Sequence, residues 1–137
     1  MFENNPLVAM AKSLARTIQN DQLFLDYMEA RKANDADTEL QSQLSDFYSI
    51  QDQMDSAITA DEKDLLLIEG LSNKLDTLYQ SIMNNPNMIR YTDVKGQYDK
   101  LMRFINQIIL TGMNGGDPET VTEESCSGNC SGCSGCN

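Results

Sequence analysis

Residues 65–82 decide the fold, and they read LLLIEGLSNKLDTLYQSI. The large apolar side chains in this stretch recur every three or four residues: Leu65, Ile68, Leu71, Leu75, Leu78 and Ile82. This spacing places them on one face of a single helix. No part of the chain shows the sustained alternation of apolar and polar residues that marks a strand. The sequence therefore predicts a long amphipathic helix here and an all-α fold.

A second stripe with the same spacing follows and ends near Thr111: Met88, Tyr91, Val94, Tyr98, Leu101, Ile105 and Ile108. Between the two stripes, Asn85 and Pro86 restart the helix, because proline is favoured at the first helical position. The two stripes match each other. We therefore expect these two helices to form a long antiparallel C-terminal pair.

Three further helices are predicted before residue 60. The first begins at Asn5 and Pro6, and the second follows Asn20 and Asp21 almost without a loop. Capping-box patterns at residues 38–41 and 59–62 are expected to open the third and fourth helices. The first helix carries one apolar stripe, made of Leu7, Ala11, Leu14 and Ile18. The predicted architecture is an elongated all-α bundle of about five helices, followed by a flexible Cys-rich tail.

The apolar pattern stops after residue 113, which predicts a helical domain at 1–113 and a flexible acidic Gly/Ser/Cys-rich tail at 114–137. The 137 residues include 21 acidic and 10 basic side chains, for a net charge of −11. The basic residues are scattered, whereas phosphate contacts need clustered Lys and Arg, so direct nucleic-acid binding is not expected. No apolar run approaches the roughly 20 residues that span a bilayer, and no signal-peptide pattern is present. A cytoplasmic protein without membrane insertion is predicted.

All four cysteines lie in the last twelve residues: Cys126, Cys130, Cys133 and Cys136. The spacing C-x3-C-x2-C-x2-C on a Gly- and Ser-containing loop lets several thiolates reach one metal centre. Three interpretations stay open on spacing alone: an iron–sulfur cluster held by three or four thiolates, a zinc site, and a tail with free thiols. In a reducing compartment such a cluster is more often metal-binding than disulfide-bonded.

The composition argues against an enzyme. Histidine, the commonest general base, is missing from the chain, and no serine lies in a G-x-S-x-G elbow. There is also no phosphate-binding glycine loop. The predicted helices offer more apolar face than a small bundle easily covers, so we expect self-association or a helical partner.

Residues 85–91 (NPNMIRY), running into 101–109 (LMRFINQII), resemble the YlbF/YmcA family of small helical bacterial regulators. Family members often show Asn-Pro followed by a hydrophobic-x-x-Tyr pattern and a closing helix similar to I-N-x-I-I. The likeness extends over about residues 6–112. Several members also end in a Cys/Gly/Ser-rich tail, which this chain matches at its four cysteines.

The resemblance implies an all-α protein that forms homodimers or hetero-oligomers with paralogous helical proteins and has no catalytic role. In the best-known case, two paralogues join a third protein in a complex that carries iron–sulfur clusters and adjusts the endoribonuclease RNase Y. That complex affects mRNA processing, competence, sporulation and biofilm formation. The leading prediction is thus a regulatory subunit whose Cys126, Cys130, Cys133 and Cys136 ligate a [4Fe–4S] cluster. The alternative is a zinc-binding or metal-independent helical scaffold with a dispensable tail.

Overall fold

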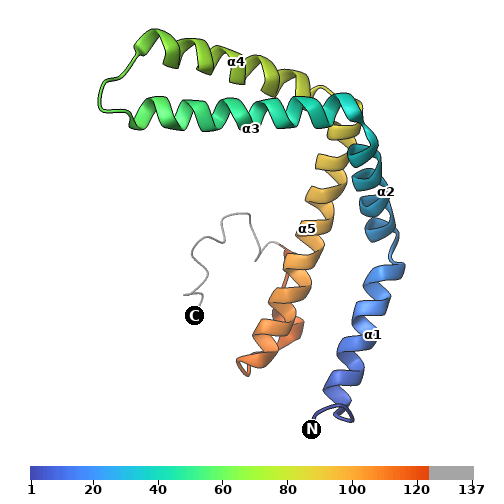
Figure 1. Cartoon of the computed structure of the whole chain (residues 1–137). Helices are drawn as coiled ribbons and strands as arrows, with labels where there is room; N and C mark the ends of the chain where they lie inside the picture. The colour runs from blue at the N-terminus through green and yellow to red at the C-terminus, as the bar shows by residue number, and fades with distance from the viewer. Residues whose placement is uncertain (124–137) are drawn as a thin grey trace. The chain divides into compact units, whose positions relative to one another are not determined.

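The structure is a computed structural model, and it describes residues 1–123. This range contains five α-helices and no strand (Figure 1). The helices are α1 (Pro6–Asn20), α2 (Gln22–Ala36), α3 (Thr38–Thr59), α4 (Leu65–Met83) and α5 (Pro86–Met113), and a short 3-10 helix, η1 (Pro118–Thr120), follows. The predictions of an all-α fold and of five helices are confirmed for the described part of the chain.

The chain divides into two compact units, residues 1–94 and 95–137, and the division falls within α5. In the first unit, α3 and α4 lie side by side as an antiparallel hairpin joined by residues 60–64 (Figure 1). Helices α1 and α2, and α2 and α3, contact each other near the single residue that joins each pair, and α2 continues from the end of α1 rather than lying beside it (Figure 1). A bundle with one core common to all five helices stays a prediction.

Within the first unit, α3 is the antiparallel partner of α4. The predicted pairing of the fourth helix with the fifth stays a prediction, because most of α5 belongs to the second unit. The start of α5 packs on α2, through the aromatic rings of Tyr27 and Tyr91, whose centroids are 6.0 Å apart. An ion pair between Glu29 and Arg90, with 3.3 Å between the charged atoms, joins the same two helices. The two stripes match in spacing, but spacing does not say which apolar face a helix meets.

Two helix starts also differ from the capping-box predictions. Helix α3 runs on through Thr59, whose hydroxyl donates to the carbonyl oxygen of Asp55 at 2.8 Å, so this residue ends a helix rather than opening one. Asp64 is the cap of α4 and accepts from the N–H of Leu67 at 3.1 Å. At the start of α3, Asp37 takes the capping role predicted for Thr38. Aspartate competes well with threonine at this position because its carboxylate accepts strongly from backbone N–H groups.

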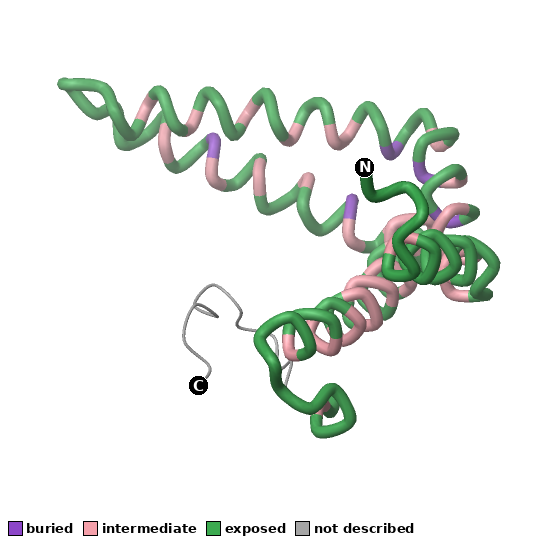
Figure 2. Tube along the Cα trace, turned by 90° about the horizontal axis from the view of Figure 1, so that it is seen from below, coloured by how far each residue is buried: buried purple, intermediate pink, exposed green. Residues whose placement is uncertain are grey.

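Few of the described residues are buried (Figure 2). In the part of the chain that the structure describes, the buried apolar residues are Ala30, Leu40, Leu71 and Ile82. The stripe on α4 faces α3 from Ile68 to Ile82, but its first member, Leu65, is 73% exposed. The hairpin therefore has a narrow core, one layer of side chains deep.

Helix α1 contributes no buried residue. Its apolar stripe exists as predicted, yet Leu7 is 73% exposed and Met10 69%, while Leu14 and Ala11 are also exposed. Only Val8 and Ile18 are half-buried. In the first unit, most of this stripe is therefore left uncovered.

In the second unit, α5 ends where the glycine-rich segment begins. Gly115 adopts a positive φ of 80°, and the N–H of Gly116 donates to the carbonyl oxygen of Thr111 at 2.9 Å. A glycine in the left-handed conformation satisfies the last carbonyl groups of a helix at no steric cost. Beyond this turn, Asp117 caps η1 by accepting from the N–H of Glu119 at 3.0 Å.

Candidate functional site

The four cysteines predicted to bind metal, Cys126, Cys130, Cys133 and Cys136, lie outside the described residues. Within residues 1–123, no group of three or more Cys, His, Asp or Glu side chains is arranged to hold a metal ion. In the same range, no helix combines the length and the apolar character needed to cross a membrane. The described candidates for function are therefore a polar junction and the apolar surfaces of the first unit.

The polar junction is centred on Asp37, between α2 and α3. One carboxylate oxygen accepts from the N–H of Leu40 at 3.0 Å and so caps α3. The other accepts from the side-chain amides of Asn85 and Asn87, both at 3.0 Å. Asn85 in turn caps α5, because its Oδ1 accepts from the N–H of Asn87 at 2.8 Å and of Met88 at 3.2 Å. One carboxylate thus ties the start of α3 to the start of α5.

These bonds act on the charge of Asp37. The backbone N–H of Leu40 lowers the pKa of the Asp37 carboxyl below its ordinary value, and the amides of Asn85 and Asn87 lower this pKa further. Hydrogen bonds to the ionised form favour that form. The carboxylate is thus held in its ionised form. Its structural role depends on pH, because protonation would weaken these hydrogen bonds.

Asn34 lies beside this junction and is 6% exposed. Its backbone carbonyl accepts from the side chain of Gln41 at 2.9 Å, and its side-chain amide contacts the sulfur of Met88 at 3.6 Å. Its Oδ1 is buried and has no hydrogen-bond partner among the described residues. The side chain of Asn34 thus joins α2 to α5 through one contact to sulfur, which is a weak acceptor.

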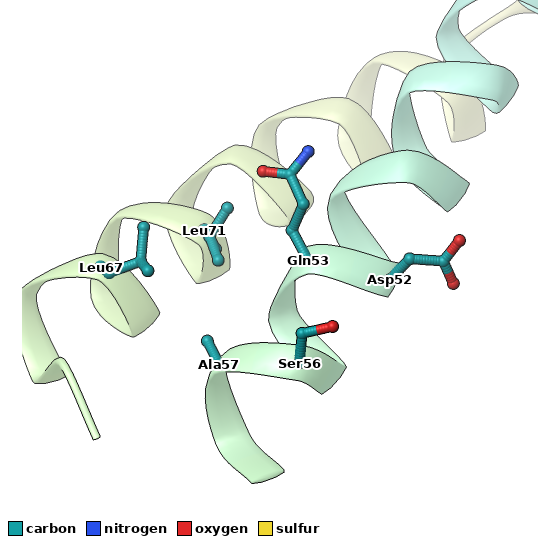
Figure 3. A pocket seen from close by; sticks show the side chains of 6 residues that line it. All are labelled: Asp52, Gln53, Ser56, Ala57, Leu67 and Leu71. Atoms are coloured by element: carbon teal, nitrogen blue, oxygen red, sulfur yellow. The ribbon is translucent and has the colours of Figure 1, made fainter. Parts of the chain in front are cut away.

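The hairpin carries a groove of about 490 Å³. Its lining comes from Asp52, Gln53, Ser56 and Ala57 on α3 and from Leu67 and Leu71 on α4. Figure 3 shows the leucine and alanine side chains beside the space between the helices, whereas the carboxylate of Asp52 points away from α4. A smaller groove of about 320 Å³ lies further along the hairpin. The larger groove offers an apolar floor to a side chain or helix that approaches from outside.

Exposed apolar side chains also flank the loop of the hairpin, whose residues 61–64 are charged. Ile58, Leu65, Leu66 and Leu67 are exposed by 46%, 73%, 82% and 50%. Exposed apolar groups clustered on one element mark interaction sites more often than scattered ones do. The groove and this end together can bind an apolar helix, and this is the chemistry that the geometry supports best.

Sequence reasoning did not find the groove or this apolar end. One signal was present, because residues 65–67 are three successive leucines and successive helical positions point about 100° apart. At most two of the three can face α3. The predicted metal ligands did not point to this apolar surface, since they lie in a different part of the chain.

Comparison with known families identifies one match over most of the chain. A family model described as control of competence regulator ComK, YlbF/YmcA, matches residues 7–114. Neither a curated protein nor a solved structure matches the chain. The matched range contains the hairpin, the polar junction and nearly all of α1.

Proposed function

The chain belongs to the YlbF/YmcA family of competence regulators, and we propose that it is a non-catalytic regulatory subunit that acts through protein–protein contacts. In this proposal it modulates RNase Y-dependent mRNA processing and, through it, competence, sporulation and biofilm formation. The observation that carries the proposal is the exposed apolar surface of α1 and of the hairpin. A surface of this kind suits a protein that works by binding other helical proteins.

The proposal includes a metal site in the C-terminal segment. Cys126, Cys130, Cys133 and Cys136 are four soft thiolate donors, and thiolate donors suit iron–sulfur clusters. We infer that they ligate a [4Fe–4S] cluster, alone or together with cysteines of a partner. There are two alternatives. One is zinc bound by the same thiolates, and the other is a metal-independent scaffold with a dispensable tail.

The cluster is tested on the full chain, purified without oxygen from cells grown with ample iron. We expect iron and acid-labile sulfide close to the amount of protein. Both should be lost in the double variant Cys130→Ser and Cys133→Ser, while the far-ultraviolet circular dichroism stays unchanged. The matched control is Ser131→Ala with Ser134→Ala, which changes the same segment without removing a thiolate. Zinc without sulfide would replace the cluster by the zinc alternative, and a loss of helicity would contradict the separation of helical body and tail.

The regulatory role is tested in cells that lack this chain. We expect RNase Y-dependent transcript ends to change in those cells and to return when the full chain is supplied. The double cysteine variant should fail to restore them if the cluster is needed. Full restoration by a chain that ends at Gly116 would favour the scaffold with a dispensable tail. Transcript ends that do not change when the chain is missing would refute the RNase Y link.

A further inference from the structure

The segment that follows α5 turns back along this helix (Figure 1). Gly115 has the positive φ that reverses the chain, and the N–H of Gly116 donates to the carbonyl oxygen of Thr111 at 2.9 Å. Further on, a carboxylate oxygen of Glu123 lies 4.0 Å from the Nζ of Lys100. All of these contacts lie within the second unit, residues 95–137.

The two contacts on α5 lie on one face of the helix. Lys100 and Thr111 are eleven residues apart, which corresponds to about three turns and about 16 Å along the axis. Phe104 and Gln107 lie between them on the same face. The seven residues after Gly116 reach up to about 23 Å when extended, so they span this distance although η1 shortens them. Residues 117–123 thus form a strap along this face.

The strap turns one apolar and one acidic side chain toward α5. The backbone of Val121 is extended, with φ −74° and ψ 129°. Alternate side chains of an extended segment point to the same side, so Val121 shares the side of Glu123, which faces Lys100. Val121 is half-buried, whereas Thr122 between the two is exposed. Val121 and Glu123 are therefore the two anchors of the strap.

The turn back depends on glycine. A Cβ atom added at Gly116 would lie 2.9 Å from Cγ2 and 3.3 Å from the carbonyl oxygen of Thr111, which is too close without a shift. A Cβ atom added at Gly112, one turn earlier, would meet no atom within 4 Å. Gly115 is needed for a different reason, because its φ of 80° is unfavourable for other residues. The sequence thus specifies this reversal at two successive positions.

The strap and the helix have opposite charges, but their contacts are weak. Residues 95–113 contain three basic residues and one acidic residue, for a charge of +2, whereas residues 117–123 carry −3. The side chains of Lys100 and Glu123 are 63% and 69% exposed, and exposed ion pairs contribute little to stability. The covalent link helps to hold the strap, since a short flexible linker gives an effective concentration of about millimolar. A free segment with more contacts than the strap can therefore displace it at a lower concentration.

We propose that the strap is a releasable cover, and that the face of α5 from Lys100 to Thr111 is a docking surface for an acidic, extended segment of a partner protein. The strap shows which chemistry this face accepts: a carboxylate near Lys100 and a β-branched apolar side chain two residues before it. A partner with this pattern binds by displacing residues 117–123. A nucleic acid fits less well, because it offers phosphates but no apolar side chain in place of Val121.

This inference goes beyond the proposed function, because it requires neither a metal on the cysteines nor a link to RNase Y. It also gives the strap a regulatory effect. Glu123 is the last described residue before the cysteine-containing segment, so that segment is attached beside Lys100 as long as the strap is seated. Displacement of the strap would free the attachment point from α5 and expose the docking surface in one step.

The experiment uses the full chain and a carbodiimide, which joins a lysine to a carboxylate only when the two are in contact. Peptide mapping by mass spectrometry should find a cross-link between Lys100 and Glu123. We expect Gly116→Ala to lower its yield at least about threefold, as the loss of contacts of this size would give. The matched control is Gly112→Ala, which should leave the yield unchanged. The ion pair of Lys95 with Asp99, within α5, supplies a reference cross-link that should form in every variant.

Docking is tested with a synthetic peptide that has the sequence of residues 117–123, DPETVTE, and blocked ends. At about millimolar concentration it should cross-link to Lys100 more strongly in Gly116→Ala than in the wild type, because the strap no longer competes. The same peptide carrying Val121→Ser should cross-link less.

A wild type that forms the reference cross-link but not that of Lys100 with Glu123 would overturn the strap. Equal yields in Gly116→Ala and Gly112→Ala would do the same. A peptide that does not reach Lys100 in Gly116→Ala, or that binds equally well with serine at position 121, would overturn the docking surface. So would displacement of the strap by a single-stranded RNA oligonucleotide but not by the peptide. These outcomes are independent of metal content and of RNase Y-dependent transcript ends, which test the proposed function separately.

Discussion

Replacing Leu40 by alanine tests how much of the stability depends on the narrow core. Leu40 is 0% exposed and lies in the first turn of α3, where its N–H also donates to Asp37. The change removes three carbon atoms, and each buried methylene contributes about 0.8 kcal/mol to stability. The cavity left behind adds to this cost, and measured values for Leu→Ala in protein cores are about 2–5 kcal/mol. We therefore expect a loss of about 3 kcal/mol in the free energy of unfolding.

The assay is urea unfolding followed by circular dichroism, repeated at two protein concentrations. The matched control is Leu66→Ala, which deletes the same atoms from a side chain that is 82% exposed and should change stability by less than about 0.5 kcal/mol. The loss from Leu40→Ala should be the same at both concentrations, because the cavity lies inside one chain. If the two variants lose equal stability, Leu40 is not buried as described and the reasoning about the core is refuted.

Three further predictions concern the junction, the hairpin and the surface. The pKa of Asp37 is lowered in the folded chain, so its contribution to stability is present above about pH 4 and is lost as pH falls through the lowered value. Acid unfolding of Asp37→Ala should depend less steeply on pH than that of the wild type, and equal slopes would contradict this. Gly70→Ala should stabilise α4 by about 1 kcal/mol, because an added Cβ meets no atom within 4 Å; a lower melting temperature would contradict it. Arg90→Ala should cost less than about 1 kcal/mol in urea unfolding, since its ion pair with Glu29 is largely exposed, and a larger loss would reveal another role for Arg90.

The sequence predicted local structure well where one residue type had one available role. Asn85 and Pro86 start α5 as expected, because a side-chain acceptor followed by proline favours a helix start. The starts of α3 and α4 were less predictable. At each, an aspartate close to the predicted threonine could also cap the helix, and the aspartate does so in the structure.

Helix pairing could not be predicted from periodicity. The stripe on α4 is apolar whichever helix covers it, and its partner depends on contacts between distant residues. The bonds from Asp37 to Asn85 and Asn87 join positions about fifty residues apart, and no local pattern indicates them. They place the start of α5 near the junction of α2 and α3.

The parts of the candidate site also differ in how far the sequence could predict them. The cysteines could be found by spacing, because metal chemistry restricts which residue types bind and how closely they follow each other. The hairpin groove could not, since Ala57, Leu67 and Leu71 are ordinary apolar residues until two helices bring them together. Periodicity identified the apolar face of α1 but could not show whether the cover comes from the same chain.

The uncovered apolar face of α1 links the stability of the chain to its assembly. The first unit fully buries few apolar side chains, and folding has to offset the conformational entropy of every ordered residue. A chain with so narrow a core has little stability to spare, so covering Leu7 and Met10 in a dimer would add stability by mass action. The melting temperature of the wild type should then rise with protein concentration, while that of the double variant Leu7→Ser with Met10→Ser should not. The same exposed face would thus set both the stability of the chain and its readiness to bind partners.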